Sequence, residues 1–547
     1  MRSFSIVILF LVSFTSFSAQ SISETQKLVS LCKVWGFLKY YHPNVAKGNV
    51  DWDKQLIQKI NELEKINDRN QLNDLYSHWI DSLGNVGECA KCTVAEPKTE
   101  FLKNFDMSWS DNEILFTKEI SQKLHYIQNN GNIDDPYYFG RSERKVFFRN
   151  ENSYSSKFTS QSISLLELFR YWNMVEYFYP YKYKTDENWN DVLTEMIPKF
   201  LGSTDDENYQ LTLAELVTKI DDSHAFLFSP LISLNQYGRR KIPVEYSYAE
   251  GKLVITKING IQYKEEIPLK VGDVIYTVDG NTIPQMVNRF GKYIPASNSW
   301  GKIKKVKSLF LFSNKDSLEV RLERDGQNIS IKAKTYLLRD IINDRKTVPE
   351  KWKFLDPEKK IGYVNMGIIE IKDLEEMFSA LKSAGSIIFD LRNYPKQTII
   401  PLSRLILPEN TIYYQFNFPD TDHPGKFYSR KNSIGRKNPD YYKGNVVILA
   451  DENTQSQAET TTMMLKQHPN SKVIGSNTSG ANGDVITFNI AGLKTSFTGI
   501  GAYYPDGRET QRIGIIPDIY IQPTVKGLKE GKDEVLERAL EYIKTGN

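Results

Sequence analysis

The chain has 547 residues, more than one hydrophobic core usually supports, so three or four domains are expected. Its composition, 40% hydrophobic and 25% charged, is typical of a globular protein. The formal net charge of +3 indicates neither a nucleic-acid partner nor a polybasic membrane contact, so we expect neither.

The first residues have the pattern of a secretory signal. Arg2 precedes the apolar run 6–12, and the small residues Ser16, Ser18 and Ala19 follow. We therefore expect residues 1–19 to be a signal peptide and the mature chain to be exported, either periplasmic or secreted. No later stretch reaches about 18 uninterrupted apolar residues, so no membrane span is expected in the mature chain.

Two segments, 20–90 and 161–239, share a spacing of tryptophans and prolines. The matching pairs are Trp35 with Trp172 and Trp52 with Trp189, each at an offset of 137 residues. Each segment predicts a helix that ends before a proline, a polar loop, a second helix led by tryptophan, and a third helix. We expect duplicated N-terminal helical subdomains with these aromatic side chains in the core, joined by an irregular linker at 91–160.

Three cysteines are present. Cys89 and Cys92 have the spacing of a thiol redox motif, but the preceding strand and following helix of such sites are lacking. A zinc site would need two more ligands, and no Cys/His cluster follows. We expect a local disulfide there, with a thiol oxidoreductase as the weaker alternative, and a buried free thiol at Cys32. No metal or cofactor is expected.

Residues 240–345 alternate in short strands, with hairpin turns at Asp279-Gly280 and Asp325-Gly326. This segment looks like a PDZ domain, a β domain that binds the C-terminal strand of a peptide at an open sheet edge. The usual Gly-Leu-Gly-Phe-type loop is not evident. A purely architectural role is therefore the alternative for this PDZ-like domain.

The segment 445–460, NVVILADENTQSQAET, combines a strand, a turn and a helix. Its apolar run has the length and β-branched content of a strand buried on both faces. Ser456 lies where this strand passes into the helix, so its hydroxyl is expected at the carboxyl end of the sheet, beside helix N–H groups that stabilise negative charge. A nucleophile elbow has this arrangement, although Gly-x-Ser-x-Gly is absent. The alternative is that Ser456 only caps the helix.

Further blocks surround this segment in a fixed order: 361–364, 387–393, 473–475, 477–483, 493–507 and 514–519. In order and spacing the chain resembles the S41 serine peptidases, which include the carboxy-terminal processing proteases and the tricorn core protease. The resemblance covers about residues 353–524. It implies a multidomain α/β protein whose residues 346–547 form a ClpP/crotonase-like S41 protease core, with a peptide or protein as substrate.

The resemblance also implies roles for individual residues. Ser456 corresponds to the attacking serine of the family pattern Thr-x-Ser-x-x-Glu, which Thr454 and Glu459 complete. The backbone N–H of Gln457 would be one oxyanion donor, and the second would come from the loop near Lys396. That loop departs from the family's DLRxNxGG, because Tyr-Pro-Lys-Gln replaces its flexible glycines.

The general base separates the branches of the family. Processing proteases have a lysine 25 residues after the serine, and here that residue is Ala481. The tricorn branch instead uses a histidine from a preceding domain, which Ser223-His224 matches, and neutral imidazole suits proton transfer near pH 7. Where tricorn has a glutamate that faces this serine, the chain has Gln511, with Glu509 as a substitute carboxylate.

Two functions follow from these residues. The first is an exported serine peptidase of the tricorn-type S41 branch, with Ser456 as nucleophile, His224 as general base, and Ser223 and Gln511 in support. The alternative is a catalytically impaired S41-fold protein that binds peptides or an apolar ligand. The pair Ser456 and His224 favours the first, whereas Gln511 and the missing glycines favour the second.

Overall fold

The computed structural model describes residues 22–89, 100–101, 103–131, 135–142, 145–261, 267–342 and 349–547. The expected signal peptide and Cys92 lie outside these ranges. Cys89 is disulfide-bonded, and Cys32 is a buried free thiol, as expected. Among the helices of the described ranges, none has both the length and the apolar character that a membrane span requires.

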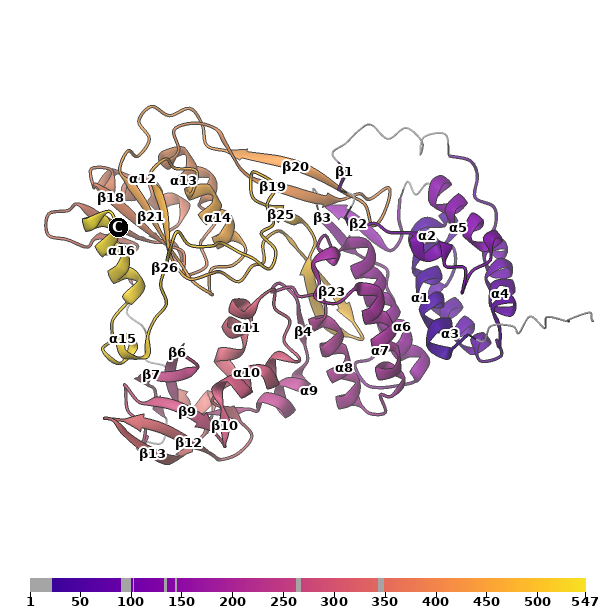
Figure 1. The fold of residues 1–547 in the computed structure, drawn as a ribbon, viewed down its shortest axis with the longest axis horizontal. Helices are drawn as coiled ribbons and strands as arrows, with labels where there is room; N and C mark the ends of the chain where they lie inside the picture. Colours follow the sequence, from indigo (N-terminus) through magenta and orange to yellow (C-terminus); the bar gives the residue numbers. More distant parts are fainter. Residues whose placement is uncertain are drawn as a thin grey trace, which may run out of the picture.

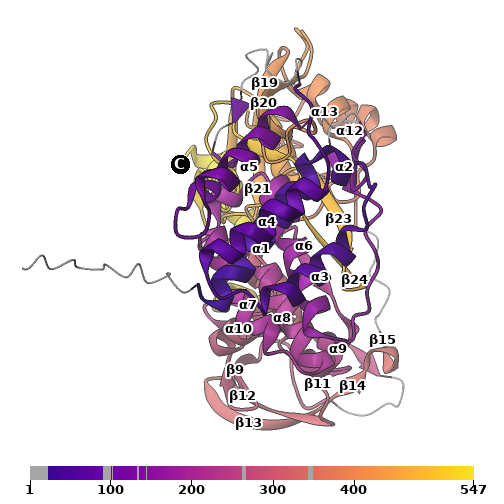
Figure 2. The same ribbon diagram turned by 90° about the vertical axis from the view of Figure 1, so that its right-hand side faces the viewer.

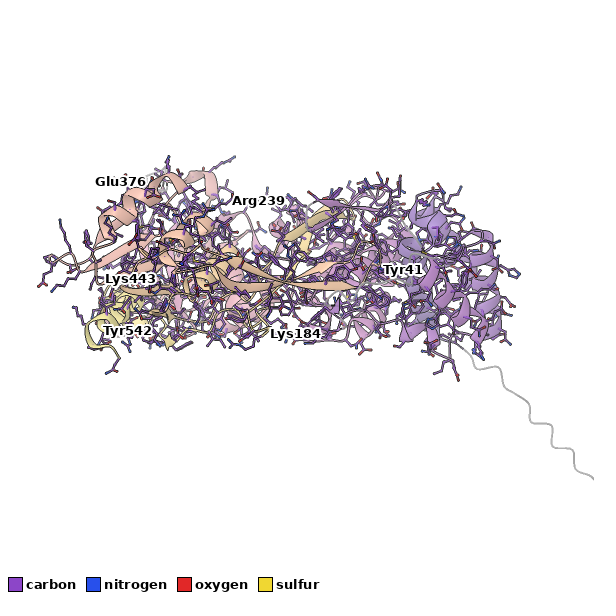
Figure 3. The ribbon with its side chains drawn as sticks, turned by 90° about the horizontal axis from the view of Figure 1, so that it is seen from above. Tyr41, Lys184, Arg239, Glu376, Lys443 and Tyr542 are labelled. Carbon is purple, nitrogen blue, oxygen red and sulfur yellow. The ribbon has the colours of Figure 1, made fainter. Side chains whose placement is uncertain are left out.

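The molecule is elongated, with helices at one end and the C-terminal α/β part at the other (Figure 1). Tyr41 of the helical part and Tyr542 near the C-terminus lie in opposite halves (Figure 3). The loop between the two long strands β19 and β20 reaches the helices, because the Tyr41 hydroxyl donates to the Pro424 carbonyl at 2.6 Å. The C-terminal part therefore contacts the helical part through the loop of this hairpin.

The helical part contains two sets of three helices with the expected order. The first set is α1 (Glu24–Tyr41), α3 (Trp52–Leu63) and α4 (Arg69–Ser82), and the second is α6 (Gln161–Phe178), α7 (Trp189–Leu201) and α8 (Asp206–Thr218). The helices α1 and α6 both end just before a proline, as expected, and pack side by side (Figure 2). The short α2 (Pro43–Ala46) and α5 (Lys118–Asn130) complete this part.

Both sets contain the same tryptophan arrangement. Trp35 and Trp52 each donate an indole N–H to the other's backbone carbonyl at 3.1 Å, and their rings are 8° from parallel. Trp172 and Trp189 make the same reciprocal pair at 2.8 and 3.1 Å, with rings 7° from parallel. All four side chains are buried, as the sequence indicated, and each indole N–H finds the partner that burial requires.

The main sheet of residues 240–342 is antiparallel and six-stranded, with five strands in the order β13-β12-β9-β7-β6 and the sixth, β10, paired with β9. Its strands are β6 (Val244–Ala249), β7 (Lys252–Ile258), β9 (Val274–Val278), β10 (Asn281–Thr282), β12 (Ser317–Arg324) and β13 (Gln327–Lys334). Both expected Asp-Gly turns have positive φ at each central residue, as a two-residue hairpin requires. We call this sheet, with helices α10 (Ile283–Gly291) and α11 (Ser299–Val306), the β domain.

The C-terminal part is organised around a six-stranded sheet in the order β16-β17-β18-β21-β22-β26. Its strands are β16 (Trp352–Phe354), β17 (Ile361–Asn365), β18 (Ser386–Asp390), β21 (Asn445–Ala450), β22 (Ser471–Gly475) and β26 (Ile519–Tyr520). All are parallel except β16. Helices α12 (Leu374–Leu381), α13 (Ile399–Ile406) and α14 (Gln457–Leu465) share a core with one face, and α16 (Glu534–Thr545) packs on the other. The central β21 is therefore buried on both faces, as its apolar run indicated.

Two smaller sheets connect these parts. One has the order β1-β20-β19-β25 and consists of β1 (Glu100–Phe101), β20 (Phe427–Ile434), β19 (Thr411–Pro419) and β25 (Gly501–Tyr503). The other has the order β23-β24-β4 and consists of β23 (Val485–Ile490), β24 (Leu493–Thr498) and β4 (Phe226–Phe228). Side chains of β23 and β24 pack into the helical core. Residues just before β4 are thereby held beside the C-terminal part, which places the Ser223-His224 turn.

Candidate active site

Ser456 lies at the turn between β21 and α14 in an unusual backbone conformation. Its φ is 58° and its ψ is −119°, whereas a residue that caps a helix normally has extended backbone angles. Ser456 and Glu459 are arranged as a capping box, but the Ser456 hydroxyl makes no cap hydrogen bond of normal geometry. Such an outlier costs about 1–3 kcal/mol and is typical of functional sites. A strained turn between a strand and a helix is also the arrangement of a nucleophile elbow.

The neighbouring backbone holds this turn in place. The Ser456 N–H donates to the Ala481 carbonyl at 2.9 Å and to Glu459 Oε2 at 3.2 Å. Glu459 is buried, and its Oε1 also accepts from the Thr478 hydroxyl and from the Gly480 N–H. Burial raises the pKa of Glu459 to about 7. The residue at the lysine position of processing proteases, Ala481, therefore contributes only its carbonyl.

The two expected oxyanion residues are adjacent. Gln457 is the first residue of α14, so its backbone N–H is one of those that a helix leaves without an intrahelical acceptor. Its side-chain amide donates to the Lys396 carbonyl at 3.1 Å. The loop after β18 thus lies against the N-terminus of α14 even though Lys396 and Gln397 stand where the family pattern has glycines. Its Tyr394 side chain is exposed.

His224 lies after the second helical set, shortly before β4, and its side chain is only 7% exposed. Its Nδ1 lies 2.8 Å from the Thr498 hydroxyl and 4.0 Å from Asp222 Oδ1. The Asp222 carboxylate accepts from the backbone N–H groups of both His224 and Thr498, which fixes the turn against β24. Burial lowers the pKa of His224; the Asp222 and Asp484 carboxylates oppose this effect, and Lys305 and Lys304 reinforce it. The imidazole is therefore held neutral, as a general base requires.

The expected hydrogen bond between His224 and Ser456 is not formed in the structure. His224 Nε2 is a buried atom without a hydrogen-bond partner among the described residues. The two turns do meet next to Ser456, because the Gln455 side-chain amide donates to the Ser223 carbonyl at 3.3 Å. Hydrogen bonds between catalytic groups are often long until substrate binds.

Ser223 is held by partners other than the expected ones. Its hydroxyl donates to the Ser479 carbonyl at 3.0 Å and accepts from the Ser297 N–H at 2.8 Å. The Gln511 side-chain amide donates to the hydroxyls of Ser297 and Tyr179, both at 3.3 Å, and to the Asp221 carbonyl at 3.4 Å, so it makes no hydrogen bond to Ser223. Glu509 does not replace it, since its carboxylate accepts from the Tyr183 hydroxyl at 2.9 and 3.0 Å. The reason is steric: the β-domain segment that contains Ser297 lies between them.

Helix α11 of the β domain contacts both turns of the site. Lys304 Nζ donates to the Asn453 carbonyl and to Gln455 Oε1 at 3.2 and 2.8 Å, beside Ser456. Lys305 Nζ donates to the Ala225 and Pro295 carbonyls, both at 2.7 Å, beside His224. A Cβ on Gly301 of this helix would lie 2.4 Å from the Ser223 hydroxyl, so only glycine permits this close approach. One helix thus positions both turns.

Comparison with known proteins identifies the C-terminal part. Residues 360–521 match the protein-family model of peptidase family S41. This region belongs to peptidase family S41. Among solved structures, mature CPAF complexed with lactacystin is similar over 71% of this chain and 99% of that chain, with 13% identity and a TM-score of 0.56. At this identity the similarity shows a shared fold. No curated protein sequence matches the chain.

Two further solved S41 peptidases match with lower scores. The photosystem II D1 C-terminal processing protease has 18% identity over 69% of this chain and 99% of that chain, with a TM-score of 0.37. The tricorn protease has 15% identity over 70% of this chain and 37% of that chain, with a TM-score of 0.32. Ser456, Gln457 and Lys396 all lie within the S41 region, whereas His224 lies upstream of it. The site is therefore assembled from the S41 region and from segments before it.

Several contacting residues were not identified from the sequence. Asp222 had a signal, since an aspartate two residues before His224 is placed for the local side-chain turn that it forms. No local sequence pattern indicated Thr498, Lys304 or Lys305, because these residues come from segments that reach the site only through the tertiary fold. Within the described ranges, no three His, Cys, Asp or Glu side chains gather in a way that could hold a metal ion.

Proposed function

We propose that this protein is an exported serine peptidase that hydrolyses peptide bonds through Ser456, with His224 as general base. The observation that carries the proposal is the strained backbone of Ser456 at the N-terminus of α14 inside an S41 region. Nothing in a purely structural capping role requires a positive φ at a serine. The unpartnered Nε2 of the buried His224 supports the same reading.

In this mechanism His224 Nε2 accepts the proton of the Ser456 hydroxyl as Oγ attacks the peptide carbonyl. Thr498 holds Nδ1, and the buried Asp222 carboxylate stabilises the imidazolium that forms, about 4.0 Å away. The Gln457 N–H, with a donor from the Lys396 loop, stabilises the oxyanion; removal of one such donor typically costs about 10²–10³ in rate. His224 then returns the proton to the leaving amine, and water releases the acyl group from Ser456 by the same route.

The test is covalent labelling of Ser456 by a fluorophosphonate, located by mass spectrometry of the labelled peptide. We expect labelling in the wild-type protein and none in Ser456→Ala. His224→Ala should slow labelling strongly, because the serine is activated only by an adjacent base. A folded wild-type protein that neither takes the label nor cleaves a mixed peptide substrate contradicts the proposal.

A second candidate function is a catalytically impaired protein that binds peptides on the S41 fold. The observation that favours it is the loop at Tyr394-Pro395-Lys396, which lacks the glycines of the family, together with Gln511, which supplies no charge. The labelling experiment separates the two, since an impaired protein retains peptide binding but leaves Ser456 unmodified.

The same proposal extends to the other parts of the chain. We propose that the two helical sets are copies of one subdomain, on the strength of their reciprocal tryptophan pairs. The β domain is PDZ-like in this view, and its α11 contacts favour an architectural role at the site. Residues 1–19 serve as the signal for export.

A further inference from the structure

A pocket of about 530 Å³ opens beside the proposed nucleophile, with Ser456 and Gln457 in its wall. This volume lies within the range of pockets that enclose small ligands or side chains. Much of the remaining wall is aromatic or aliphatic, from Tyr394, Ile399, Tyr413, Tyr414, Phe416 and Ile500. The proposed reacting atom and these aromatic and aliphatic side chains therefore share one pocket, whose wall also includes the polar residues Ser142, Thr460 and Asn482.

A bulge in β19 builds the aromatic wall. Successive residues of a strand normally point to opposite faces, yet Tyr413 and Tyr414 both line the pocket. The pairing with β20 shifts between Ile412 and Tyr414, so Tyr413 is the extra residue of a β-bulge. The rings of Tyr414 and Tyr413 meet edge to face with centroids 4.4 Å apart, and Phe416 follows at 4.2 Å from Tyr414. The bulge thus adds one aromatic side chain to the pocket.

The rest of the wall leaves room and carries no net charge. A Cβ on Gly483, where φ is 106°, would lie 1.9 Å from the Ile500 carbonyl, so this position of the wall consists of backbone alone. One cation, Lys145 of β3 (Lys145–Phe148), and one anion, Asp484, also line the pocket. Because their charges are opposite, the pocket has no overall preference for an acidic or a basic side chain.

We propose that this pocket receives the side chain on the acyl side of the cleaved bond and selects large uncharged side chains, aromatic or branched aliphatic. The inference rests on the proposed peptidase function. The side chain nearest the attacked carbonyl enters the cavity that has Ser456 in its wall, and an aromatic residue gains most from burial against Tyr413, Tyr414 and Phe416. Small side chains leave the cavity largely unfilled.

The first test compares peptides that differ only at one position, with Phe, Leu, Ala, Lys or Asp, and identifies the cleaved bond by mass spectrometry. We expect cleavage after Phe and Leu, with kcat/KM at least about 100-fold above that for Ala, since even one methylene in an apolar pocket is worth about 10–200-fold. Lys and Asp should be cleaved no better than Ala.

A matched pair of variants tests the pocket itself. Ile399→Trp fills the cavity, and we expect it to lower kcat/KM for the Phe peptide about 10-fold or more while the Ala peptide changes little. Ile400→Trp is the control, because Ile400 is the next residue of α13, is 56% exposed and does not line the pocket. Equal losses on both peptides, or equal effects of both variants, overturn the assignment.

Binding distinguishes failure of this inference from failure of the proposed function. If fluorophosphonate labels Ser456 but cleavage shows no preference for Phe and Leu, the peptidase function stands and the pocket assignment is wrong. If no label and no cleavage are found, calorimetry of the Phe and Ala peptides on Ser456→Ala decides the pocket alone. Tighter binding of the Phe peptide, weakened by Ile399→Trp, supports the side-chain class, and equal or absent binding overturns it.

Discussion

The strained backbone at Ser456 predicts that a glycine at this position raises the stability of the protein and abolishes its activity. Ser456→Ala removes the hydroxyl but keeps a Cβ at φ 58°, so the strain remains. Ser456→Gly removes both the hydroxyl and the Cβ, and glycine adopts positive φ without steric cost. Both variants should lose about a million-fold in peptide cleavage, since the nucleophile is absent. Only the glycine variant should become more stable.

The magnitude follows from two opposing effects. Relief of the strained conformation is worth about 1–3 kcal/mol. Glycine also gains conformational freedom in the unfolded chain, which costs about 0.4–1 kcal/mol. The difference favours Ser456→Gly over Ser456→Ala by about 1 kcal/mol. For a core of roughly 200 residues this corresponds to a rise of about 2–4 °C in Tm.

The assay is thermal unfolding followed by circular dichroism, with Ser456→Ala as the matched reference and fluorophosphonate labelling as the check on activity. The chain has several cores, so the comparison is made on the transition that Ser456 variants shift. A glycine variant that melts at or below the alanine variant refutes the argument that the elbow stores strain. Retained cleavage in folded Ser456→Ala refutes its role as nucleophile.

Three further predictions concern the surrounding groups. His224→Ala should reduce kcat nearly as much as Ser456→Ala, whereas Lys466→Ala should keep near wild-type activity in the same assay, because no lysine serves as base. The acid limb of kcat/KM should lie below pH 6.5, since the pKa of His224 is lowered. Lys304→Met should move this limb to higher pH, because Lys304 helps to lower that pKa. Lys302→Met is the control and should not move it, because Lys302 is not one of the charged groups that shift the His224 pKa. The pKa of Glu459 is raised to about 7 in the folded state. Its contribution to the free energy of unfolding is therefore present below its ordinary pKa and is lost as the pH rises to about 7. In urea unfolding, the stability of wild type relative to Glu459→Gln should fall by up to about 3 kcal/mol between pH 4.5 and 8.

Local patterns in the sequence predicted the elements of the fold well. The strand β21, the turn at Ser456 and the helix α14 follow from one apolar run and its polar boundary. The two Asp-Gly hairpins of the β domain follow from a dipeptide that favours positive φ at both of its positions. The bulge in β19 left no such signal, because its aromatic run, Tyr413 to Phe416, is compatible with a regular strand.

Only those parts of the site that follow from the family resemblance or from a local turn could be predicted from the sequence. Ser456 lies at the turn between a buried strand and a helix, as its flanking sequence predicted. The roles of Ser456, Gln457 and Lys396 in catalysis stay predictions from the family pattern. Gln511 donates to Ser297 of the β domain, which itself donates to the Ser223 hydroxyl, and the sequence did not indicate this intervening residue. No spacing in the sequence indicates which of several domains will insert a loop at a site. Contacts between distant segments are decided by the packing of whole domains.

The position of β24 between β23 and β4 has a consequence for the newly made chain. During synthesis the histidine turn appears before Ser456, but Thr498, which holds the imidazole, appears later than both. β4 has no strand neighbour in this sheet until β24 exists. A nascent chain that ends before β24 therefore lacks both the strand that pairs with β4 and the hydroxyl that contacts His224 Nδ1. Under the proposed function, the order of the segments along the chain thereby places completion of the site near the end of translation.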